Sequence, residues 1–258
     1  MIGIGAGDPR HMTVQAIEAL NASDAVFLLD KGAEKGDLLQ LRTAICARFL
    51  SNPRCRMVSA PSPARDLAAP YRTGVDAWHD DKAAIYAALI AGLGPDETGS
   101  FLVWGDPALY DSTLRILDRI RGQIPFETAV VPGISAAQAL AAAHRIPLNR
   151  IGEPVHLTTG RKLREAMAIA ADSVVFLDSG EALATLPAEG LDIWWGAYLG
   201  TPDEALVAGP LAEVRDDILR LRAAKRAAKG WIMDIYLLRE RGLSRPWAGE
   251  SRDPGCAS

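Results

Sequence analysis

The chain has 258 residues, of which 23% are charged and 49% hydrophobic, and its formal net charge is −4. This is ordinary globular composition, with enough length for one large domain or two smaller ones. An acidic balance argues against a nucleic-acid partner, because phosphate binding needs a clustered basic face. The basic run at 220–229 has the spacing of an amphipathic helix with one solvated face.

Targeting and metal-binding signals are missing from the sequence. There is no secretory leader pattern and no apolar stretch of about 18 residues or more, so we expect a cytoplasmic protein without a membrane span. The three cysteines, Cys46, Cys55 and Cys256, are scattered and show no ligand spacing. We therefore predict reduced thiols and no metal site.

Strands and helices alternate over the first half of the chain. The patterns predict strands at 1–4, 25–29, 101–104 and 128–131, and helices at 14–20, 38–49, 85–93, 114–120 and 135–144, with a loop at 59–70. Thr13 and Ser112 are placed to cap two of these helices. Alternation of this kind is typical of a parallel sheet covered by helices. The first strand is short for such a sheet, which leaves open a start upstream of Met1.

The second half has a different character. It predicts short strands at 155–158, 174–177, 193–195 and 231–238, with helices near 163–171 and 211–228. We expect a separate α/β domain with a mixed sheet. The predicted division is an N-terminal domain at 1–150, a C-terminal domain at 151–241 and a disordered tail at 242–258, with the break near 147–152.

The tripeptide Gly-Asp-Pro occurs twice, at 7–9 and at 105–107, and each copy follows a short apolar run. A strand that ends in glycine and a carboxylate places bare backbone and a strong acceptor at the carboxyl edge of a sheet. Ligands of open α/β sheets bind at that edge. Two such edges predict a small-molecule site between them.

The glycine-rich start partly matches a dinucleotide-binding fingerprint. Gly3 and Gly5 fill its first two glycine positions, and Asp30 could be the acid that binds a ribose. The third glycine should stand where Asp8 stands, and a carboxylate there would repel a pyrophosphate. An NAD(P)-dependent oxidoreductase is therefore a disfavoured alternative.

Three blocks together resemble the tetrapyrrole methylase family. They are Gly3-Ile-Gly-Ala-Gly-Asp-Pro, Trp104-Gly-Asp-Pro-Ala-Leu-Tyr and Val131-Pro-Gly-Ile-Ser-Ala, and their order and spacing match over about residues 1–240. The resemblance implies two α/β domains, S-adenosylmethionine (SAM) as cofactor in the cleft between them, and a homodimer. It also implies a tetrapyrrole of the precorrin type as substrate.

Four segments resemble one kind of member of this family: 104–113, 158–161, 195–201 and 230–234. That resemblance implies methylation of a cobalamin precursor at C1 of the macrocycle, with release of an acetyl unit as acetate. A methylase of the same family that acts at another position is the alternative. A protein without a ligand would not need glycine and carboxylate at two sheet edges.

The resemblance assigns cofactor contacts to matching positions only. They are Ala6, Trp104, Gly105, Asp106, Leu109, Ser135, Ala136, Leu177, and Ala197 or Tyr198 with a register uncertain by one. Two positions depart from the wider family, because Trp104 replaces a common glycine and Ala6 a common proline. The bulk of Trp104 should narrow the pocket, so its contact is expected through the backbone.

The chemistry divides into two parts. Methyl transfer needs orientation more than a strong acid or base, and Asp106 could accept from the cofactor's amino group or offset the sulfonium charge. Release of acetate needs an activated water, for which Asp8, Asp30 and Tyr110 are the candidates. Arg161 is the first choice for binding substrate carboxylates, and Arg10, Lys31 and Arg72 are weaker choices.

Overall fold

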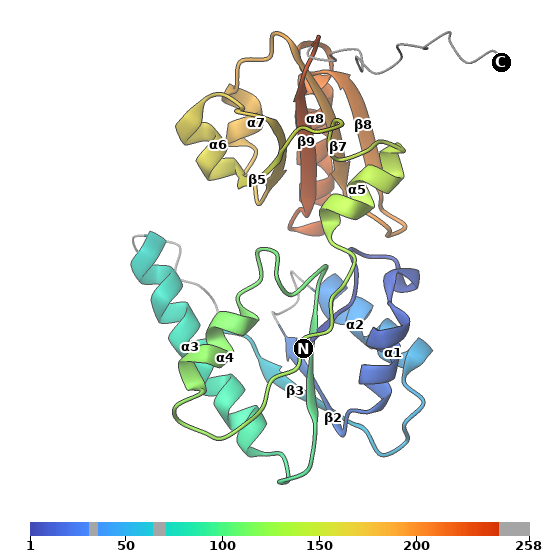
Figure 1. Cartoon of the computed structure of the whole chain (residues 1–258), viewed down its shortest axis with the longest axis vertical. Coiled ribbons are helices and arrows are strands. Elements are labelled where there is room, and N and C mark those ends of the chain that lie inside the picture. The colour runs from blue at the N-terminus through green and yellow to red at the C-terminus, as the bar shows by residue number, and fades with distance from the viewer. Residues whose placement is uncertain (31–35, 64–70, 243–258) are drawn as a thin grey trace, which may run out of the picture.

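The computed structural model describes residues 1–30, 36–63 and 71–242, and it divides into two α/β bodies, one below the other in Figure 1. The first body holds a four-stranded sheet and the second a five-stranded sheet. Lys31 and the tail at 243–258 lie outside the described residues. The predicted fold class, two α/β domains with different sheets, is confirmed.

The N-terminal sheet is parallel throughout, as predicted. Its strands are β1 (Ile2–Gly3), β2 (Ala25–Asp30), β3 (Arg56–Pro61) and β4 (Gly99–Val103), in the order β1-β4-β2-β3. The prediction of a loop from 59 onward was wrong at its start, because β3 continues to Pro61. This strand lies at the sheet edge and is half exposed, so no apolar run marks it, and an edge tolerates proline.

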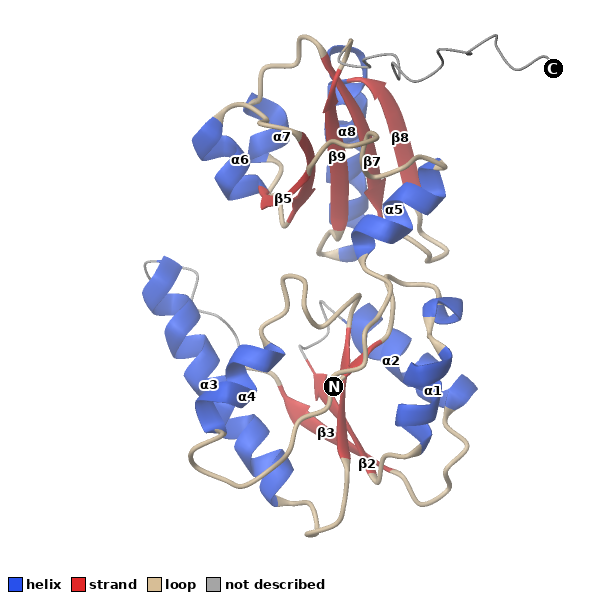
Figure 2. Ribbon diagram, in the orientation of Figure 1, coloured by secondary structure: helices blue, strands red, loops and turns tan. Residues whose placement is uncertain are grey.

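Helices cover both faces of this sheet (Figure 2). The helices α1 (Val14–Asn21) and α2 (Gly36–Phe49) cover one face, and α3 (Tyr71–Ala91) and α4 (Thr113–Ile120) cover the other. Successive strand residues alternate between the two cores: Val26 and Leu28 face α1 and α2, whereas Phe27 faces α3 and α4. Among the described residues, no helix combines the length and apolarity needed to cross a bilayer.

Of the two serine or threonine residues predicted to cap helices, only one makes a capping hydrogen bond. Thr13 caps α1 as predicted, since its Oγ1 accepts from the N–H of Ala16 at 3.1 Å. Ser112 stands at the N-cap of α4, but its hydroxyl makes no capping bond. The carboxylate of Asp111 accepts from the N–H of Thr113 at 2.7 Å and takes that role.

The strand predicted at 128–131 is wrong except for its last residue. Val131 forms an isolated parallel bridge with Ile2, through hydrogen bonds to Met1 and Gly3. A two-residue β1 offers too few backbone partners to extend this pairing into a strand.

The C-terminal sheet is mixed, as predicted. Its strands are β5 (Val155–Thr159), β6 (Asp172–Phe176), β7 (Leu191–Ala197), β8 (Ala205–Pro210) and β9 (Asp234–Glu240), in the order β5-β6-β9-β7-β8. Only the pair β5–β6 is parallel. The edge strand β8 and the five-residue helix α7 (Glu181–Thr185) were not predicted, because neither carries a long apolar pattern.

Helices also cover both faces of the second sheet. The helices α6 (Gly160–Ala166), α7 and α8 (Leu211–Lys229) pack on one face, and α5 (Ala136–His144) packs on the other. Thus α5 precedes the predicted break at 147–152 yet shares its core with the C-terminal sheet. The division at 150 stays a prediction, but the packing partners change before α5.

Docking of α5 on the C-terminal sheet yields a stability prediction. Leu140 is fully buried against β6 and β9 residues, so Leu140→Ala should lower the free energy of unfolding by about 2–5 kcal/mol. Urea denaturation followed by circular dichroism measures this. Val14→Ala, at a side chain that is 72% exposed, should change it by less than about 0.5 kcal/mol. Equal effects of the two substitutions would contradict the packing described here.

Candidate functional site

The three sequence blocks meet at one backbone junction. Gly5 and Gly105 form an antiparallel bridge, in which the Gly105 N–H donates to Gly5 O at 2.8 Å. A Cβ on Gly133 would lie 2.2 Å from Gly105 O, and a Cβ on Gly3 would lie 2.6 Å from Gly133 N. Real Cβ atoms do not approach backbone so closely, so the junction requires glycine at 3 and 133.

Asp106 closes this junction with both carboxylate oxygens. Its Oδ2 accepts from the N–H of Gly133 and its Oδ1 from the N–H of Ala108, each at 2.8 Å. The residue therefore braces the Gly-Asp-Pro turn and ties it to the segment before α5. A carboxylate has about four acceptor sites, so these two bonds leave capacity for a ligand.

The N-terminus of α5 lies beside Gly105. A Cβ added to Gly105 would lie 3.8 Å from Ser135 Cα and 4.0 Å from Ala136 N, with nothing closer. Ser135 is buried and forms a capping box with Gln138. The first turn of a helix offers N–H groups without intrahelical partners, which suit an anionic group such as a carboxylate. The structure thus brings Gly105, Asp106, Ser135 and Ala136 together.

The other residues of the second block line this junction less directly. Trp104 is half-buried, and its indole Nε1 is buried without a hydrogen-bond partner among the described residues. A buried donor of this kind needs a partner, so a bound ligand or water would satisfy it. Leu109 is half-buried and its N–H donates to Asp106 O at 3.2 Å.

Three of the predicted site residues have left-handed backbone. The φ angles of Tyr110, Leu177 and Tyr198 are 51°, 52° and 49°. Such a conformation costs an L-residue about 1–2 kcal/mol, and it clusters at sites where function constrains the chain. The two other described non-glycine residues with positive φ, Arg145 and Met167, end helices α5 and α6, where left-handed residues are common.

Leu177 and Tyr110 present apolar surface where the two bodies meet. The Leu177 side chain is 69% exposed, a large fraction for leucine, and it follows the end of β6. Its neighbour Phe176 packs against the ring of Tyr110, with 4.7 Å between the ring centroids. This contact joins the turn that follows Asp106 to the end of β6.

A buried arginine fixes the turn that carries Leu177. Arg222 of α8 donates to Asp178 O at 2.7 Å and to Ser179 O at 2.8 Å, and its Nε donates to Asp234 Oδ2 at 2.8 Å. Burial raises the pKa of the Asp234 carboxyl, and Arg222 opposes that shift. Sequence reasoning missed Arg222, which looks like one more cation on a basic amphipathic helix.

Ala197 ends β7, and Tyr198 begins the loop that leads to the first Gly-Asp-Pro motif. Ala197 is fully buried, and the Tyr198 hydroxyl donates to Trp231 O at 2.6 Å, so neither side chain is open to a ligand. The following loop approaches the other body closely, because a Cβ on Gly7 would lie 2.2 Å from Leu199 O. Ala6 is buried in the same apolar cluster as Leu199. These residues can contact a ligand only through backbone.

The candidates for water activation lie in different surroundings. Asp8 accepts from the Arg10 guanidinium at 2.6 Å, and this bond holds the pKa of the Asp8 carboxyl below its usual range. Asp30 is exposed at the end of β2, and its carbonyl accepts from the N–H of Ser62. Burial raises the pKa of the Tyr110 phenol, which is therefore neutral at neutral pH.

Two of the predicted substrate cations are described, and each pairs with an acid close to it in sequence: Arg10 with Asp8, and Arg161 with Glu165. Arg161 lies at the start of α6, where its guanidinium pairs with Glu165 at 3.1 Å. Lys31 is outside the described residues, and the side chain of Arg72 is as well. Within the described part of the chain, no group of three or more His, Cys, Asp or Glu side chains could hold a metal ion.

The glycine-rich start does not lead into a dinucleotide cradle. After β1 the chain forms a short 3-10 helix at Pro9–His11, capped by Asp8, and α1 begins only at Val14. A pyrophosphate cradle needs a helix N-terminus directly after the glycines. The alternative of a dinucleotide-dependent oxidoreductase therefore lacks its structural basis.

Comparison with known proteins agrees with this geometry. The family model described as Tetrapyrrole (Corrin/Porphyrin) Methylases matches residues 1–215, and the chain belongs to this family. It is a SAM-dependent methyltransferase. The chain is 51% identical over 245 residues to the precorrin-6A synthase (deacetylating) of Sinorhizobium sp. The matched region covers 93% of this chain and 94% of that protein.

Solved structures resemble the chain over nearly its whole length. The cobalamin synthesis related protein CobF of Corynebacterium diphtheriae is 39% identical with a TM-score of 0.78, covering 93% of this chain and 96% of that one. A uroporphyrin-III C-methyl transferase of Thermus thermophilus, solved with S-adenosyl homocysteine, is 20% identical with a TM-score of 0.55 over 92% of this chain and 90% of that one. The second likeness concerns the fold alone.

The exposed Leu177 yields a prediction that separates function from stability. Leu177→Gly removes the left-handed strain and the apolar side chain, so we expect unchanged or slightly higher stability. Affinity for S-adenosylhomocysteine should fall about tenfold, because a buried leucine contact is worth about 1.5–3 kcal/mol. Calorimetric titration and thermal melting measure the two effects.

Met167→Gly is the matched control for this substitution. Met167 has the same left-handed backbone, with φ 53°, but it lies at the far end of α6. It should leave affinity unchanged. A loss of affinity in both variants, or in neither, would remove Leu177 from the cofactor site.

Proposed function

We propose that the protein methylates C1 of precorrin-5 with SAM and releases the extruded acetyl unit as acetate, forming precorrin-6A. The observation that carries the site is the junction of the three glycine-containing blocks, braced by Asp106 and placed at the N-terminus of α5. The choice of reaction rests on the near full-length similarity to a precorrin-6A synthase (deacetylating). Another methylation of the same substrate class is the alternative.

The residues at the junction suit the parts of SAM. Bound SAM supplies an electrophilic methyl group on a sulfonium. The Asp106 carboxylate can accept from its amino group and offset the positive charge, because two of its acceptor sites remain. The first N–H groups of α5 suit its carboxylate. Leu177 offers apolar surface to an adenine.

Ligand binding tests the cofactor directly. Titration of the wild-type protein with S-adenosylhomocysteine should give saturable heat, and titration with NADH should give none. Asp106→Ala should weaken binding at least tenfold, since a hydrogen bond to a charged group is worth about 1.5–3 kcal/mol.

Asp24→Ala serves as the matched control. Asp24 also braces backbone with its carboxylate, accepting from Thr98 N–H at 2.9 Å, but at the opposite edge of the sheet. Its affinity should equal that of the wild type. Binding of NADH alone would overturn the methyltransferase assignment of the site.

The three candidates for acetate release differ in how readily each can accept a proton from the attacking water. The Arg10 contact keeps Asp8 ionised and makes it a weaker proton acceptor. Tyr110 is a neutral phenol at neutral pH and can position a water by hydrogen bonding. We therefore assign proton transfer from the attacking water to Asp30, at the carboxyl end of β2, with Tyr110 as the positioning group.

Separate measurement of the two products tests this assignment. With precorrin-5 and SAM, Asp30→Asn should slow acetate release by about 10²–10⁴-fold, while formation of S-adenosylhomocysteine stays near the wild-type rate. Asp8→Asn should change the ratio of the two products little. Equal loss of both products in Asp30→Asn would show that Asp30 does not act on the water.

The proposal extends to assembly and location. We propose a homodimer in the cytoplasm, as the family resemblance implies, with Arg161 near the carboxylates of the bound macrocycle. Arg161 is half exposed and its partner Glu165 is on the same helix. The Arg161 guanidinium could exchange the Glu165 carboxylate for a carboxylate of the substrate.

A further inference from the structure

The turn after β6 is held from inside the second body by one arginine. Arg222 of α8 is buried, which is rare for arginine. Its Nη2 donates to Asp178 O at 2.7 Å and its Nη1 to Ser179 O at 2.8 Å. Its Nε donates to Asp234 Oδ2 at 2.8 Å. Because the guanidinium is planar, these bonds fix the two carbonyls relative to the carboxylate.

The same turn is bound by the side chain of Asp178 as well as by its main chain. The Asp178 carboxylate accepts from three backbone N–H groups within 180–183 and from the Tyr236 hydroxyl. A Cβ on Gly180 would lie 2.8 Å from Arg222 Nη1, and the φ angle of Gly180 is 101°. The turn therefore has a single backbone path that both the guanidinium and the carboxylate require.

Leu177 is the residue whose conformation this network controls. It directly precedes Asp178, its φ angle is 52°, and its side chain is 69% exposed. A left-handed backbone is unfavourable for leucine and persists only where the surrounding chain is held. The bonds from Arg222 to the carbonyls of Asp178 and Ser179 hold the chain at that point.

Asp234 connects this turn with the end of β7. Its Oδ2 also accepts from the Trp195 indole at 2.9 Å, and Asp234 stands opposite Ala197 in the pairing of β7 with β9. The side chains of Arg222 and Asp234 are 9% and 5% exposed, so solvent screens their attraction little. Leu177 and Ala197 are both predicted cofactor contacts, and one buried ion pair lies behind both.

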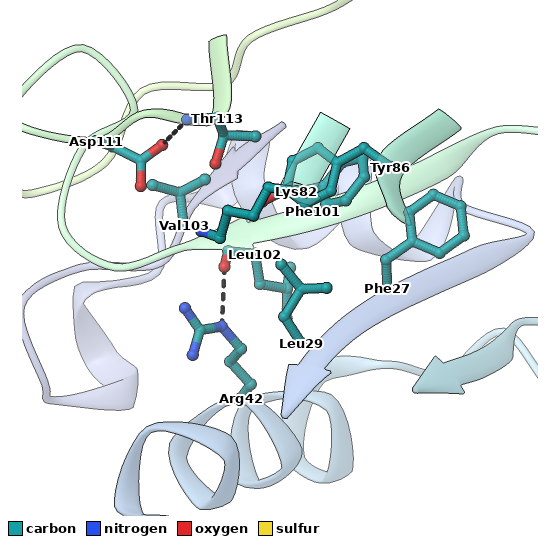
Figure 3. A pocket seen from close by; sticks show the side chains of 10 residues that line it. All are labelled: Phe27, Leu29, Arg42, Lys82, Tyr86, Phe101, Leu102, Val103, Asp111 and Thr113. Carbon is teal, nitrogen blue, oxygen red and sulfur yellow. Dashed lines mark hydrogen bonds between the residues drawn. The ribbon is translucent and has the colours of Figure 1, made fainter. Parts of the chain in front are cut away.

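Arg42 in the first body shows a contrasting case. Its Nε donates to Leu102 O at 2.9 Å beside a cavity of about 50 Å³ (Figure 3). Leu102 lies in β4 and pairs with Ile2 of β1, so strand pairing already fixes the backbone that Arg42 binds. The bonds of Arg222 differ, because they hold a turn that directly follows a residue with left-handed backbone.

We propose that Arg222 is a positioning residue of the cofactor site, which acts through Leu177 and contacts no ligand itself. Together with Asp234 it holds Leu177 in the conformation that presents an apolar side chain to the adenine. This role rests on the proposed place of Leu177 in the SAM site. Loss of the guanidinium should therefore lower cofactor affinity by releasing the turn.

A double-mutant cycle tests the path through Leu177. Lysine keeps the charge of arginine without its planar fork, so Arg222→Lys should weaken binding of S-adenosylhomocysteine about tenfold, as expected for loss of the Leu177 contact. In a Leu177→Gly background the same substitution should add no more than about a twofold loss. Calorimetric titration of the four proteins measures this. A tenfold loss in both backgrounds would overturn the proposal.

The backbone ¹³C chemical shifts of Leu177 report its φ angle without any ligand. In Arg222→Lys these shifts should move away from left-handed values. Asp234→Asn keeps an acceptor oxygen but removes the charge that holds Arg222, so it should move them in the same direction. It also decides the question if Arg222→Lys does not fold. Unchanged Leu177 shifts in the folded variants would contradict the positioning role.

Arg239→Lys is the matched control in the same body. Arg239 also pairs with a buried acid, Asp172, at 2.8 Å and donates to two carbonyls at 147–148, but at the opposite end of β6. It should lower the melting temperature, as Arg222→Lys does, and leave the Leu177 shifts and the affinity at wild-type values. An equal loss of affinity in both variants would show a general effect of buried ion pairs and reject the specific role.

Failure of the cofactor assignment gives a different pattern of results. If the wild type does not bind S-adenosylhomocysteine but the Leu177 shifts still move in Arg222→Lys, the proposed function is rejected and the hold of Arg222 on the turn stands. If the wild type binds and Leu177→Gly binds equally well, the proposed function stands and the role of Arg222 in cofactor affinity is rejected.

Discussion

The close approach of Gly3, Gly105 and Gly133, closed by the carboxylate of Asp106, is the constraint on which the rest of the structure depends. Gly105 O occupies the place that a side chain at 133 would need, and Asp106 Oδ2 binds the Gly133 N–H at 2.8 Å. Because α5 follows this junction and packs on the C-terminal sheet, the same contact helps to orient the second body on the first. Three short motifs thus control both the local site and the relation between the two sheets.

The site combines this rigid junction with residues under backbone strain. Leu177 holds a left-handed conformation because Arg222 binds the two carbonyls that follow it. Arg222 is itself held by Asp234, so a buried charge pair in the second body supports an apolar side chain at the surface. Strain of this kind persists only where the surroundings over-determine it, and here they do.

Sequence patterns predicted much of this arrangement, because the site depends on glycine, on a carboxylate directly after an apolar strand, and on a helix-capping serine. Gly-Asp-Pro after an apolar run located both sheet edges, and Ser135 located the start of α5. The role of Arg222 was not predictable, because its partners come from two distant segments of the chain. Strand β8 was not predicted, although its residues 205–208 form a short apolar run.

The order of strands in the second sheet has a consequence for how the protein is made. Strand β9 is synthesised after the other four strands of its sheet, yet it lies between β6 and β7 and pairs with both. The parallel sheet of the first body needs nothing beyond Val131 and can assemble early in synthesis. The second sheet stays in two pieces until residue 240 has emerged. During synthesis the first body can therefore be folded while the second sheet, in which Leu177 follows β6, still lacks its central strand.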